Sequence, residues 1–234
     1  MILVTGGAGH IGNVLVRDLV NAGKKVRVLA LPGEKIESLD GLDVDIVWGN
    51  ILSLDDLRKA MDGVNLVFHL ASYVALTADQ YDLMRKVNVE GTENVLQVCQ
   101  EMKVERLVYT SSIHAYERVP EGVVIDEHLK FDPQNPDGLY DRTKAEATLL
   151  VLEAAKNGMN AVVVCPTGVV GPYDYKLSEI GELIITWMKR RASISTDGGY
   201  DFVDVRDVSA GHILAAEKGR SGEVYILGGE RMSI

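Results

Sequence analysis

The sequence predicts an α/β protein built on a doubly wound parallel sheet, and three observations lead to this fold class. Apolar strand-like runs alternate with helical segments through the first two thirds of the chain. Most of these runs are continuous rather than alternating in polarity, as expected for strands that helices cover on both faces. The first twenty residues place a strand, a glycine turn and a helix start in direct succession.

The individual elements follow from the same pattern. The expected strands are Ile2–Val4, Lys25–Leu31, Val44–Trp48, Leu66–Leu70, Arg106–Thr110, Ala161–Cys165 and Glu223–Leu227. Apolar residues at helical spacing predict helices over Val14–Val20, Leu54–Met61, Tyr81–Met102, Glu179–Arg190 and Val208–Lys218. A further helix is expected to start at Asp137–Asp141, ahead of the good helix formers Lys144–Ala147.

The turn Thr5–Gly12 reads TGGAGHIG and joins the first strand to the first helix. Glycine is needed where the backbone takes a positive φ or where a phosphate approaches closely, and the amides of a helix start favour an anion. Gly7, Gly9 and Gly12 fit the general dinucleotide fingerprint, and Gly6, Gly9 and Gly12 fit a variant with three-residue spacing. This context favours a dinucleotide site, in a domain of the Rossmann type, over an ordinary tight turn.

The chain is expected to divide at about residue 165. Residues 1–165 contain no linker or internal repeat and should form the dinucleotide-binding Rossmann domain. After Pro166, glycines, prolines and tyrosines break the periodicity, and the expected helices stand among loops. Residues 166–234 should therefore be a substrate-facing segment interleaved with the last sheet strands, because α/β enzymes bind ligands outside the carboxyl ends of their strands.

The composition limits the possible partners. The chain has 234 residues and a net charge of −10, which disfavours nucleic acid and anionic membranes as partners. Cys99 and Cys165 lie far apart and in no paired spacing, so neither a disulfide framework nor a zinc site is expected. Met1 leads directly into the first strand, and no apolar stretch approaches the roughly 18 residues of a membrane span. These features predict a cytoplasmic protein.

Three side chains could move a proton. Tyr140 and Lys144 are four residues apart and should share a helix face, where the lysine charge should lower the pKa of the phenol toward the range of efficient acid–base catalysis. The third is a serine of the segment Thr110–Ser112, which follows Leu107–Tyr109 at the same sheet edge as the glycine turn. Taken singly, Tyr140 and Lys144 read as a surface pair and the serine as a turn former. Together with a dinucleotide site, they indicate carbonyl reduction.

Seven motifs follow one another in order along essentially the whole chain. They are Thr5–Gly12, Phe68–Ser72, Val87–Thr92, Thr110–Ser112, Tyr140-x-x-x-Lys144, Pro166–Pro172 and Phe202–Val208. In these motifs the chain resembles the extended short-chain dehydrogenase/reductases, in their epimerase/dehydratase and dihydroflavonol-reductase-like group. The resemblance implies that Ser112, rather than Ser111, is the catalytic serine, with Tyr140 as proton donor and Lys144 also holding the nicotinamide ribose.

The resemblance also implies a set of ligand contacts. Those expected for the cofactor, besides Tyr140 and Lys144, are Gly6, Gly9, His10, Ile11 and Gly12 in the glycine turn, Asn50 and Ile51 at the adenine, Leu70, Ala71 and Ser72 at the pyrophosphate and ribose, and Pro166, Gly168 and Val169 at the nicotinamide. His10 is expected to fill space over the cofactor rather than to act as an acid, and His69 to be a core residue. The candidate substrate contacts are Tyr73, His114, Thr167 and Tyr173.

The chain departs from the family pattern at the end of the second strand. Ala30 stands where NAD-preferring members carry an acidic residue, and Leu31 where many NADP-preferring members carry arginine. With no carboxylate to repel a 2′-phosphate and Lys35 close by, NADP is slightly favoured over NAD. Asn50 replaces the usual aspartate, which alters an adenine hydrogen bond. Members of the family commonly run longer, so we expect a small, truncated C-terminal substrate-binding part or an open pocket.

The resulting prediction is an NAD(P)-dependent oxidoreductase that reduces a carbonyl or oxidises an alcohol on a small organic substrate. Two alternatives stay open: a nucleotide-sugar epimerase or dehydratase, which uses the same groups, and a non-catalytic protein that senses NADPH. No histidines or carboxylates have metal-ligand spacing, so no metal is predicted. The expected partner is a small-molecule substrate, with no nucleic acid or membrane, and a homodimer is left open.

Overall fold

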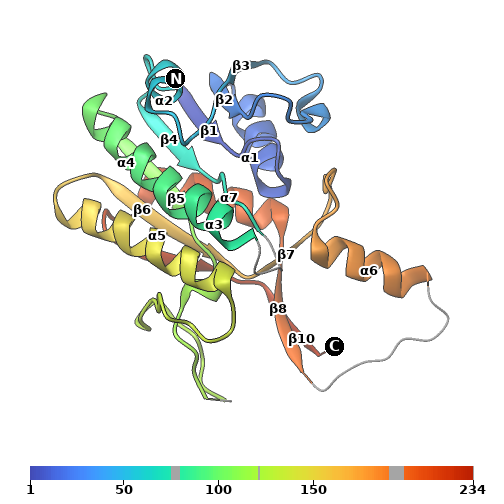
Figure 1. Cartoon of the computed structure of the whole chain (residues 1–234). Coiled ribbons are helices and arrows are strands. Elements are labelled where there is room, and N and C mark those ends of the chain that lie inside the picture. Colours follow the sequence, from blue (N-terminus) through green and yellow to red (C-terminus); the bar gives the residue numbers. More distant parts are fainter. Residues whose placement is uncertain (75–79, 121, 190–197, 234) are drawn as a thin grey trace.

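A computed structural model describes residues 1–74, 80–120, 122–189 and 198–233 of the chain (Figure 1). These residues form a parallel seven-stranded sheet in the order β3-β2-β1-β4-β5-β6-β9. Its strands are β1 (Ile2–Thr5), β2 (Val26–Ala30), β3 (Val44–Trp48), β4 (Leu66–His69), β5 (Arg106–Thr110), β6 (Ala161–Pro166) and β9 (Val224–Leu227). The strand order reverses beside β1, as in doubly wound dinucleotide-binding sheets. The predicted fold class is confirmed.

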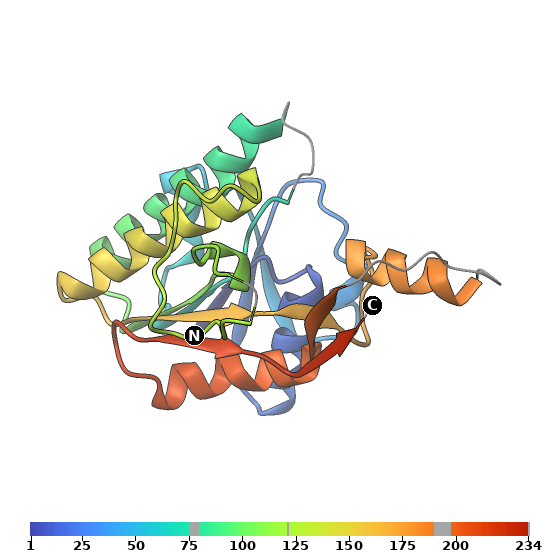
Figure 2. The ribbon, with the colours of Figure 1, turned by 90° about the horizontal axis from the view of Figure 1, so that it is seen from below.

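Helices cover both faces of this sheet (Figures 1 and 2). One face packs against α1 (His10–Asn21) and α7 (Val205–Lys218), and the other against α2 (Leu54–Ala60), α4 (Gly91–Glu101) and α5 (Leu139–Lys156). Neighbouring residues of β5 are buried on opposite faces: Leu107 and Tyr109 lie on the α4–α5 side, and Val108 on the α1–α7 side. Two-sided burial explains why the strands read as continuous apolar runs.

The stretch predicted as one helix, Tyr81–Met102, consists of three consecutive pieces. These are α3 (Tyr81–Arg85), the π-helical turn η3 (Lys86–Glu90) and α4. A π-helical turn carries one extra residue and is frequent at functional sites. Here it contains Asn88, which is buried against the end of β4 and the start of α5.

A second, three-stranded sheet was not predicted. Its strands β7 (Gly168–Val170), β8 (Gly199–Asp204) and β10 (Glu230–Ser233) pair in the order β10-β8-β7. The two helices and the strand β9 predicted in this region are present, but three segments expected to be loops form strands. These short strands pair with partners distant in the sequence and leave no local periodicity. Since β9 lies beside β6 in the large sheet, residues 166–234 contribute strands to both sheets.

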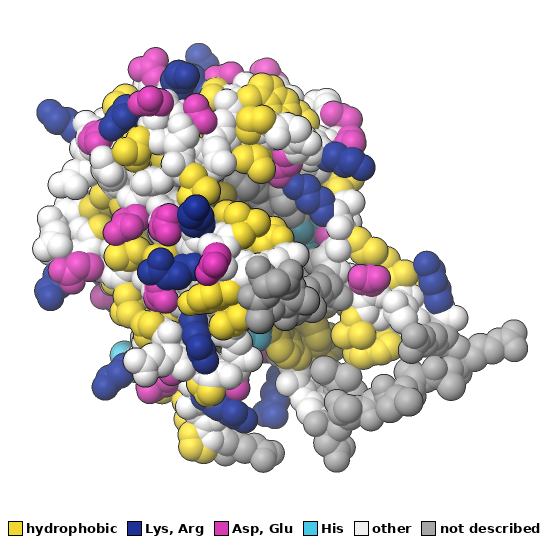
Figure 3. Space-filling view, viewed as in Figure 1, with side chains coloured by type: hydrophobic (Ala, Val, Ile, Leu, Met, Phe, Trp, Pro, Cys, Tyr) yellow, Lys and Arg dark blue, Asp and Glu magenta, His cyan; other side chains and the backbone are white. Residues whose placement is uncertain are grey.

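Helix α6 (Glu179–Lys189) projects to one side of the two sheets and adjoins the smaller sheet at β7 (Figure 1). Its Leu183, Ile185 and Met188 are exposed, and hydrophobic side chains gather over this helix in Figure 3. The last residue of the predicted helix, Arg190, lies outside the described residues. The remaining short elements are the 3-10 turns η1 (Glu37–Leu39) and η4 (Ile113–Ala115).

Candidate active site

The glycine turn forms an open cradle at the carboxyl end of β1. Gly6 has a φ of +71°, and a Cβ there would come within 2.7 Å of the Ala71 nitrogen. A Cβ on Gly12 would collide with the Gly6 carbonyl oxygen. No side chain caps the start of α1 and no acidic residue lies in its first turn, so its free amides are available to an anion. This geometry fits the pyrophosphate of a dinucleotide.

Gly9 does not supply the positive φ of the turn. Its φ of −75° is ordinary, so the positive φ of the turn lies at Gly6 instead. A Cβ on Gly9 would meet one neighbour within 4 Å, the Gly6 oxygen at 3.2 Å. The backbone therefore tolerates a Cβ at this position, and the absence of one keeps the cradle open.

A buried hydrogen-bond chain holds the end of β4 against the glycine turn. His69 lies fully buried between Thr5, whose Oγ1 is 2.7 Å from Nδ1, and Thr92, whose Oγ1 is 3.0 Å from Nε2. Thr92 donates its own proton to the Asn88 carbonyl, so it accepts from Nε2 and leaves Nδ1 to accept from Thr5. Burial lowers the pKa of His69 to about 3, and the imidazole stays neutral. His69 is thus the core residue that was expected.

The segment Leu70–Ser72, after β4, is fixed from two sides. Thr5 Oγ1 accepts from the Ala71 nitrogen at 3.2 Å, and Asn88 Oδ1 accepts from Ser72 Oγ at 3.0 Å and from the Tyr73 nitrogen at 2.7 Å. Asn88 Nδ2 also donates to Thr143 Oγ1, next to Lys144 in α5. The π-helical turn therefore connects the segment expected at the cofactor with the helix that carries Tyr140.

The two residues expected at the adenine, Asn50 and Ile51, make hydrogen bonds within the protein. Asn50 Oδ1 accepts from the Leu52 nitrogen at 2.9 Å, and the Ile51 carbonyl accepts from Asn94 at 3.2 Å. The Ile51 side chain is buried, and its Cδ1 lies where a Cβ on Gly91 would be. Asn50 and Ile51 therefore form part of the surface expected at the adenine through where they lie, rather than through side-chain groups that are free to bind it.

Ser112, Tyr140 and Lys144 meet at the carboxyl edge of the sheet. Ser112 lies between β5 and η4, and its Oγ accepts from the His114 nitrogen at 3.2 Å. Lys144 is 3% exposed, and its Nζ donates to the Thr110 carbonyl at 2.6 Å and lies 4.8 Å from the centre of the Tyr109 ring. The side chains of Ser112 and Ser72 lie close enough to the Tyr140 phenol to act on its pKa. The surface-pair reading of Tyr140 and Lys144 is therefore wrong.

The expected lowering of the Tyr140 pKa is not observed. Burial raises this pKa to about 12, although the neighbouring hydroxyls of Ser112 and Ser72 oppose the rise. Burial also lowers the pKa of Lys144 to about 8, because a charge in this position loses its hydration. Removal from water outweighs the charge of the neighbouring lysine, which points at Thr110. In this state Tyr140 is a protonated phenol at neutral pH.

The loop between β7 and α6 is attached to the glycine-turn side of the large sheet. His10 Nε2 donates to the Pro172 carbonyl at 3.0 Å, Asn13 donates to the Tyr173 carbonyl at 3.1 Å, and the Arg17 guanidinium lies 4.6 Å from the Tyr173 ring centre. Tyr173 takes a φ of +68°, which is rare for a residue with a Cβ. His10 thus ties this loop to the turn, and Tyr173 packs against α1.

An ion pair continues this attachment at the end of β2. Lys176 Nζ lies 2.5 Å from Glu34 Oε1, and the second Glu34 oxygen accepts from the Leu31 nitrogen at 3.1 Å. A pocket of about 320 Å³ adjoins the pair, lined by Ala8, Lys35, Glu37, Ser38, Tyr175 and Lys176. Ala30 is fully buried and Leu31 is half exposed. Sequence reasoning found Lys35 but missed Lys176, which no local pattern connects with β2.

Two residues beside the catalytic edge were also missed. Tyr200 of β8 lies over Gly168, where a Cβ would come within 2.7 Å of its ring, and its hydroxyl hydrogen-bonds His114 Nε2. Asp141 Oδ1 lies 3.6 Å from His114 Nδ1. Of the expected substrate contacts, His114 adjoins Tyr140, and Thr167 is fixed by its nitrogen to the Leu227 carbonyl at 3.1 Å. The Tyr73 hydroxyl donates to Gln80 at the start of α3.

The described part of the chain contains no group of three side chains placed to hold a metal ion. Within the same residues, no helix combines the length and the apolarity that a membrane crossing requires.

Comparison with known proteins adds a family match. A model of the 3-beta hydroxysteroid dehydrogenase/isomerase family matches residues 3–224. "Sterol demethylase protein B" of Methylococcus capsulatus is 36% identical over 232 residues, 99% of this chain and 70% of its own length. A "putative dihydroflavonol 4-reductase" of Synechocystis sp. is 36% identical over 235 residues, 99% of this chain and 68% of its own.

Solved structures agree with these relatives. The crystal structure of gox2253 is 33% identical, with a TM-score of 0.94 over 100% of this chain and 71% of that one. UDP-glucose 4-epimerase of Thermus thermophilus, solved in complex with NAD, is 28% identical, with a TM-score of 0.85 over 99% of this chain and 79% of that one. The matched relatives and structures extend beyond the length of this chain.

Proposed function

Because this chain belongs to the 3-beta hydroxysteroid dehydrogenase/isomerase family and is an NAD(P)-dependent enzyme of the short-chain dehydrogenase/reductase type, we propose that it reduces a carbonyl group of a small organic substrate. The reverse reaction, oxidation of the matching alcohol, uses the same groups. Relatives named as reductases and dehydrogenases favour catalysis over a role in sensing NADPH.

One observation carries the proposal: a protonated phenol, two serine hydroxyls and a buried lysine converge beside the open glycine cradle. Tyr140 keeps its proton at neutral pH, as a general acid must. Ser112 and Ser72 lie near the phenol, and Lys144 is buried one helical turn away. A solvated surface tyrosine would need none of these neighbours.

Each side chain has a distinct part in this reaction. When bound, the nicotinamide cofactor supplies or takes up the hydride. Ser112 hydrogen-bonds the carbonyl oxygen of the substrate, and Tyr140 gives its phenolic proton to that oxygen as negative charge develops there. Lys144 would hold the ribose hydroxyls of the cofactor, and its charge would stabilise the phenolate that remains.

The cofactor would occupy the carboxyl edge of the large sheet. Gly6, Gly9, Gly12 and the first turn of α1 would hold the pyrophosphate, with Leu70–Ser72 beside it and Pro166–Val169 near the nicotinamide. We favour NADP over NAD because the pocket at the end of β2 contains Lys35 and Lys176, and because Ala30 offers no carboxylate to the ribose.

The substrate would lie between the two sheets' facing edges. Residues 1–165 would mainly bind the cofactor, while residues 166–234 together with Tyr73 and His114 would contact the substrate. We further propose that the enzyme works in the cytoplasm, and a homodimer remains a prediction.

The test is to incubate the purified protein with NADPH or NADH and a panel of ketones, aldehydes and nucleotide sugars. Loss of absorbance of the reduced cofactor that depends on a simple carbonyl compound supports the proposal. Tightly held NAD that never exchanges, with isomerisation of a nucleotide sugar, would identify an epimerase instead. Cofactor binding without turnover of any compound would contradict the assignment.

A further inference from the structure

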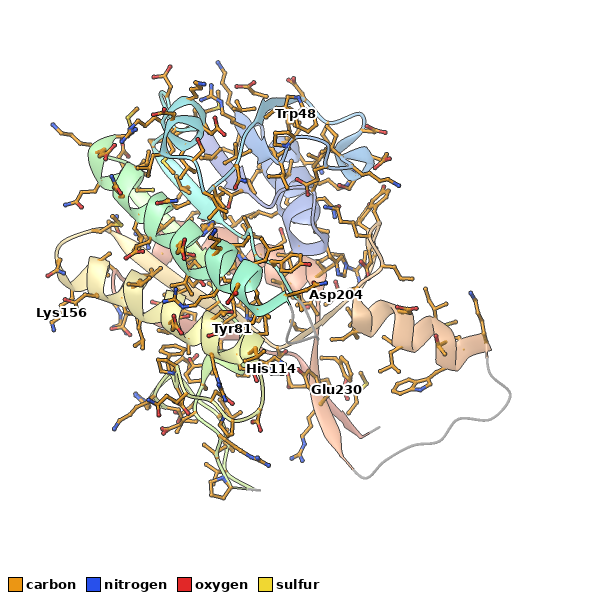
Figure 4. The ribbon with its side chains drawn as sticks, in the orientation of Figure 1. Trp48, Tyr81, His114, Lys156, Asp204 and Glu230 are labelled. Carbon is orange, nitrogen blue, oxygen red and sulfur yellow. The ribbon has the colours of Figure 1, made fainter. Side chains whose placement is uncertain are left out.

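Beside Tyr140 lies a second set of linked polar side chains from three elements. His114 belongs to η4, Asp141 to α5 and Tyr200 to β8. The His114 ring stands edge-on to the Tyr140 ring, with centres 6.5 Å apart, and lies 6.0 Å from the Tyr200 ring. Figure 4 shows His114 where the start of α5 approaches the strands of the smaller sheet. The set therefore spans the space between the two sheets.

Asp141 determines how the imidazole of His114 is used. The Asp141 side chain is 10% exposed and its Oδ1 lies 3.6 Å from Nδ1, so an Nδ1–H directed at it is favoured electrostatically. A buried carboxylate that faced the lone pair of Nδ1 would be left uncompensated. In the neutral ring this leaves Nε2 as the hydrogen-bond acceptor, by the same logic that an aspartate applies to a catalytic histidine.

Tyr200 then acts as the donor to Nε2. Its hydroxyl hydrogen-bonds Nε2, and burial together with Asp141 raises the pKa of the phenol, which keeps it protonated. Packing on Gly168 and against Phe202 holds the ring in place. In the described part of the chain His114 is the one hydrogen-bond partner of this hydroxyl. The Tyr200 oxygen accordingly keeps its acceptor capacity free.

We propose that Tyr200, oriented by His114 and Asp141, accepts a hydrogen bond from a hydroxyl group of the substrate other than the oxygen that Tyr140 protonates. The inference rests on the proposed carbonyl reduction and names its substrate class, hydroxy-carbonyl compounds with the hydroxyl a few bonds from the reacting carbon. Tyr200 is a binding residue here, and His114 and Asp141 are positioning residues.

The charges around Tyr200 favour a neutral hydroxyl over a carboxylate. With the imidazole of His114 neutral, the Asp141 carboxylate leaves the pair with a net negative charge, which repels a second carboxylate. An acceptor oxygen repels the lone pairs of a carboxylate, whereas a hydroxyl brings its own proton. The site should therefore discriminate a hydroxy ketone from a keto acid of the same size.

The test compares three ketones with their α-hydroxy counterparts as substrates for NADPH oxidation: acetone with hydroxyacetone, cyclohexanone with 2-hydroxycyclohexanone, and acetophenone with 2-hydroxyacetophenone. Tyr200→Phe should reduce the kcat/KM preference for the hydroxy ketone over the plain ketone about tenfold, because the hydroxy ketone loses far more activity than the plain ketone. Tyr225→Phe, on the far strand β9, is the matched control and should alter neither substrate. Pyruvate should be a poorer substrate than hydroxyacetone.

Several outcomes would overturn the proposal. It fails if Tyr200→Phe keeps the preference, if the hydroxy ketone and the plain ketone lose activity together, or if a protein that binds NADPH reduces none of the hydroxy ketones. Failure of the reductase assignment itself looks different, because the wild-type protein then reduces no carbonyl compound in the wider panel.

A second measurement needs no substrate. The ¹⁵N NMR signals of the His114 ring, identified by their absence in His114→Gln, should show Nδ1 protonated with Nε2 as acceptor at neutral pH. Asp141→Asn should remove the preference for this tautomer, and Tyr200→Phe should shift the Nε2 signal. A neutral ring protonated on Nε2 in the wild-type protein would contradict the orientation on which the proposal depends.

Discussion

Replacing Lys176 with glutamine should weaken the binding of NADPH and leave the binding of NADH unchanged. Lys176 lies beside the pocket at the end of β2, where a 2′-phosphate would be the only additional group that NADPH brings. At present its partner is Glu34, at 2.5 Å. Cofactor binding would exchange this internal carboxylate for a phosphate of higher charge, and only NADPH could make the exchange.

The structure sets the size of the effect. The Lys176 side chain is 48% exposed and that of Glu34 is 22% exposed, so solvent screens their attraction. A hydrogen bond to a charged group contributes about 1.5–3 kcal/mol, and the exposure of Lys176 places it near the lower limit. An affinity loss of about tenfold, or about 1.4 kcal/mol, is expected for Lys176→Gln. Glu34→Gln should act oppositely and strengthen NADPH binding by roughly 0.5–1 kcal/mol, because Lys176 loses a competing partner.

Calorimetric titration with adenosine 2′,5′-bisphosphate and with 5′-AMP isolates the contribution of the 2′-phosphate to binding, since these ligands differ by that one phosphate. Lys176→Gln should affect the first ligand and spare the second. Lys24→Gln, an exposed lysine near the end of α1, serves as the charge-matched control. Equal weakening of both ligands by Lys176→Gln, or a loss of affinity in Glu34→Gln, would refute the reasoning.

Three further predictions address the cradle, the β2 end and the buried histidines. Gly9→Val should remove NADPH binding while the melting temperature stays near the wild-type value. Gly12→Ala should lower the melting temperature, because its Cβ meets the Gly6 carbonyl. A folded Gly9→Val protein that binds NADPH normally would contradict the assignment of the glycine turn to the pyrophosphate. Leu31→Arg, at a half-exposed position, should raise the affinity for NADPH relative to NADH by about tenfold, as a charged hydrogen bond allows, and an unchanged ratio would place the ribose elsewhere. His69 and His212, with pKa values lowered by burial to about 3 and 4, take up protons only on unfolding between pH 6.5 and 4, so stability should fall as pH falls through this window, by about 1.4 kcal/mol per pH unit for each histidine. Urea unfolding of wild type and His212→Gln at pH 6.5 and pH 5 measures this slope, and equal slopes would contradict it.

Much of the fold could be predicted because its elements leave patterns among residues that are neighbours in the sequence. The apolar run Ile2–Val4, the glycine turn and the following helix are adjacent in sequence, and two-sided burial left clear runs for the central strands. The small sheet left no such pattern, because Gly168–Val170 and Glu230–Ser233 are strands only through their pairing with β8. Short strands of this kind depend on partners that a local reading does not see.

Local motifs likewise predicted part of the candidate site, whereas features that depend on distant contacts were missed. Ser112, Tyr140 and Lys144 were found because each lies in a motif, and the structure brings them to one sheet edge. The environment of Tyr140 was misjudged, since its burial depends on packing from several elements rather than on the spacing to Lys144. Lys176 was missed because its contact with Glu34 joins segments 142 residues apart.

The most direct test of the proposed mechanism uses Tyr140→Phe. Its turnover of a carbonyl substrate from the panel is measured, together with its dissociation constant for NADPH. Removing one oxygen leaves the ring and Lys144 in place, so kcat should fall about 100-fold or more while the dissociation constant changes little. Tyr225→Phe, the matched control, should retain wild-type turnover. A Tyr140→Phe enzyme that keeps most of its turnover would contradict proton donation by this residue, and with it the proposed mechanism.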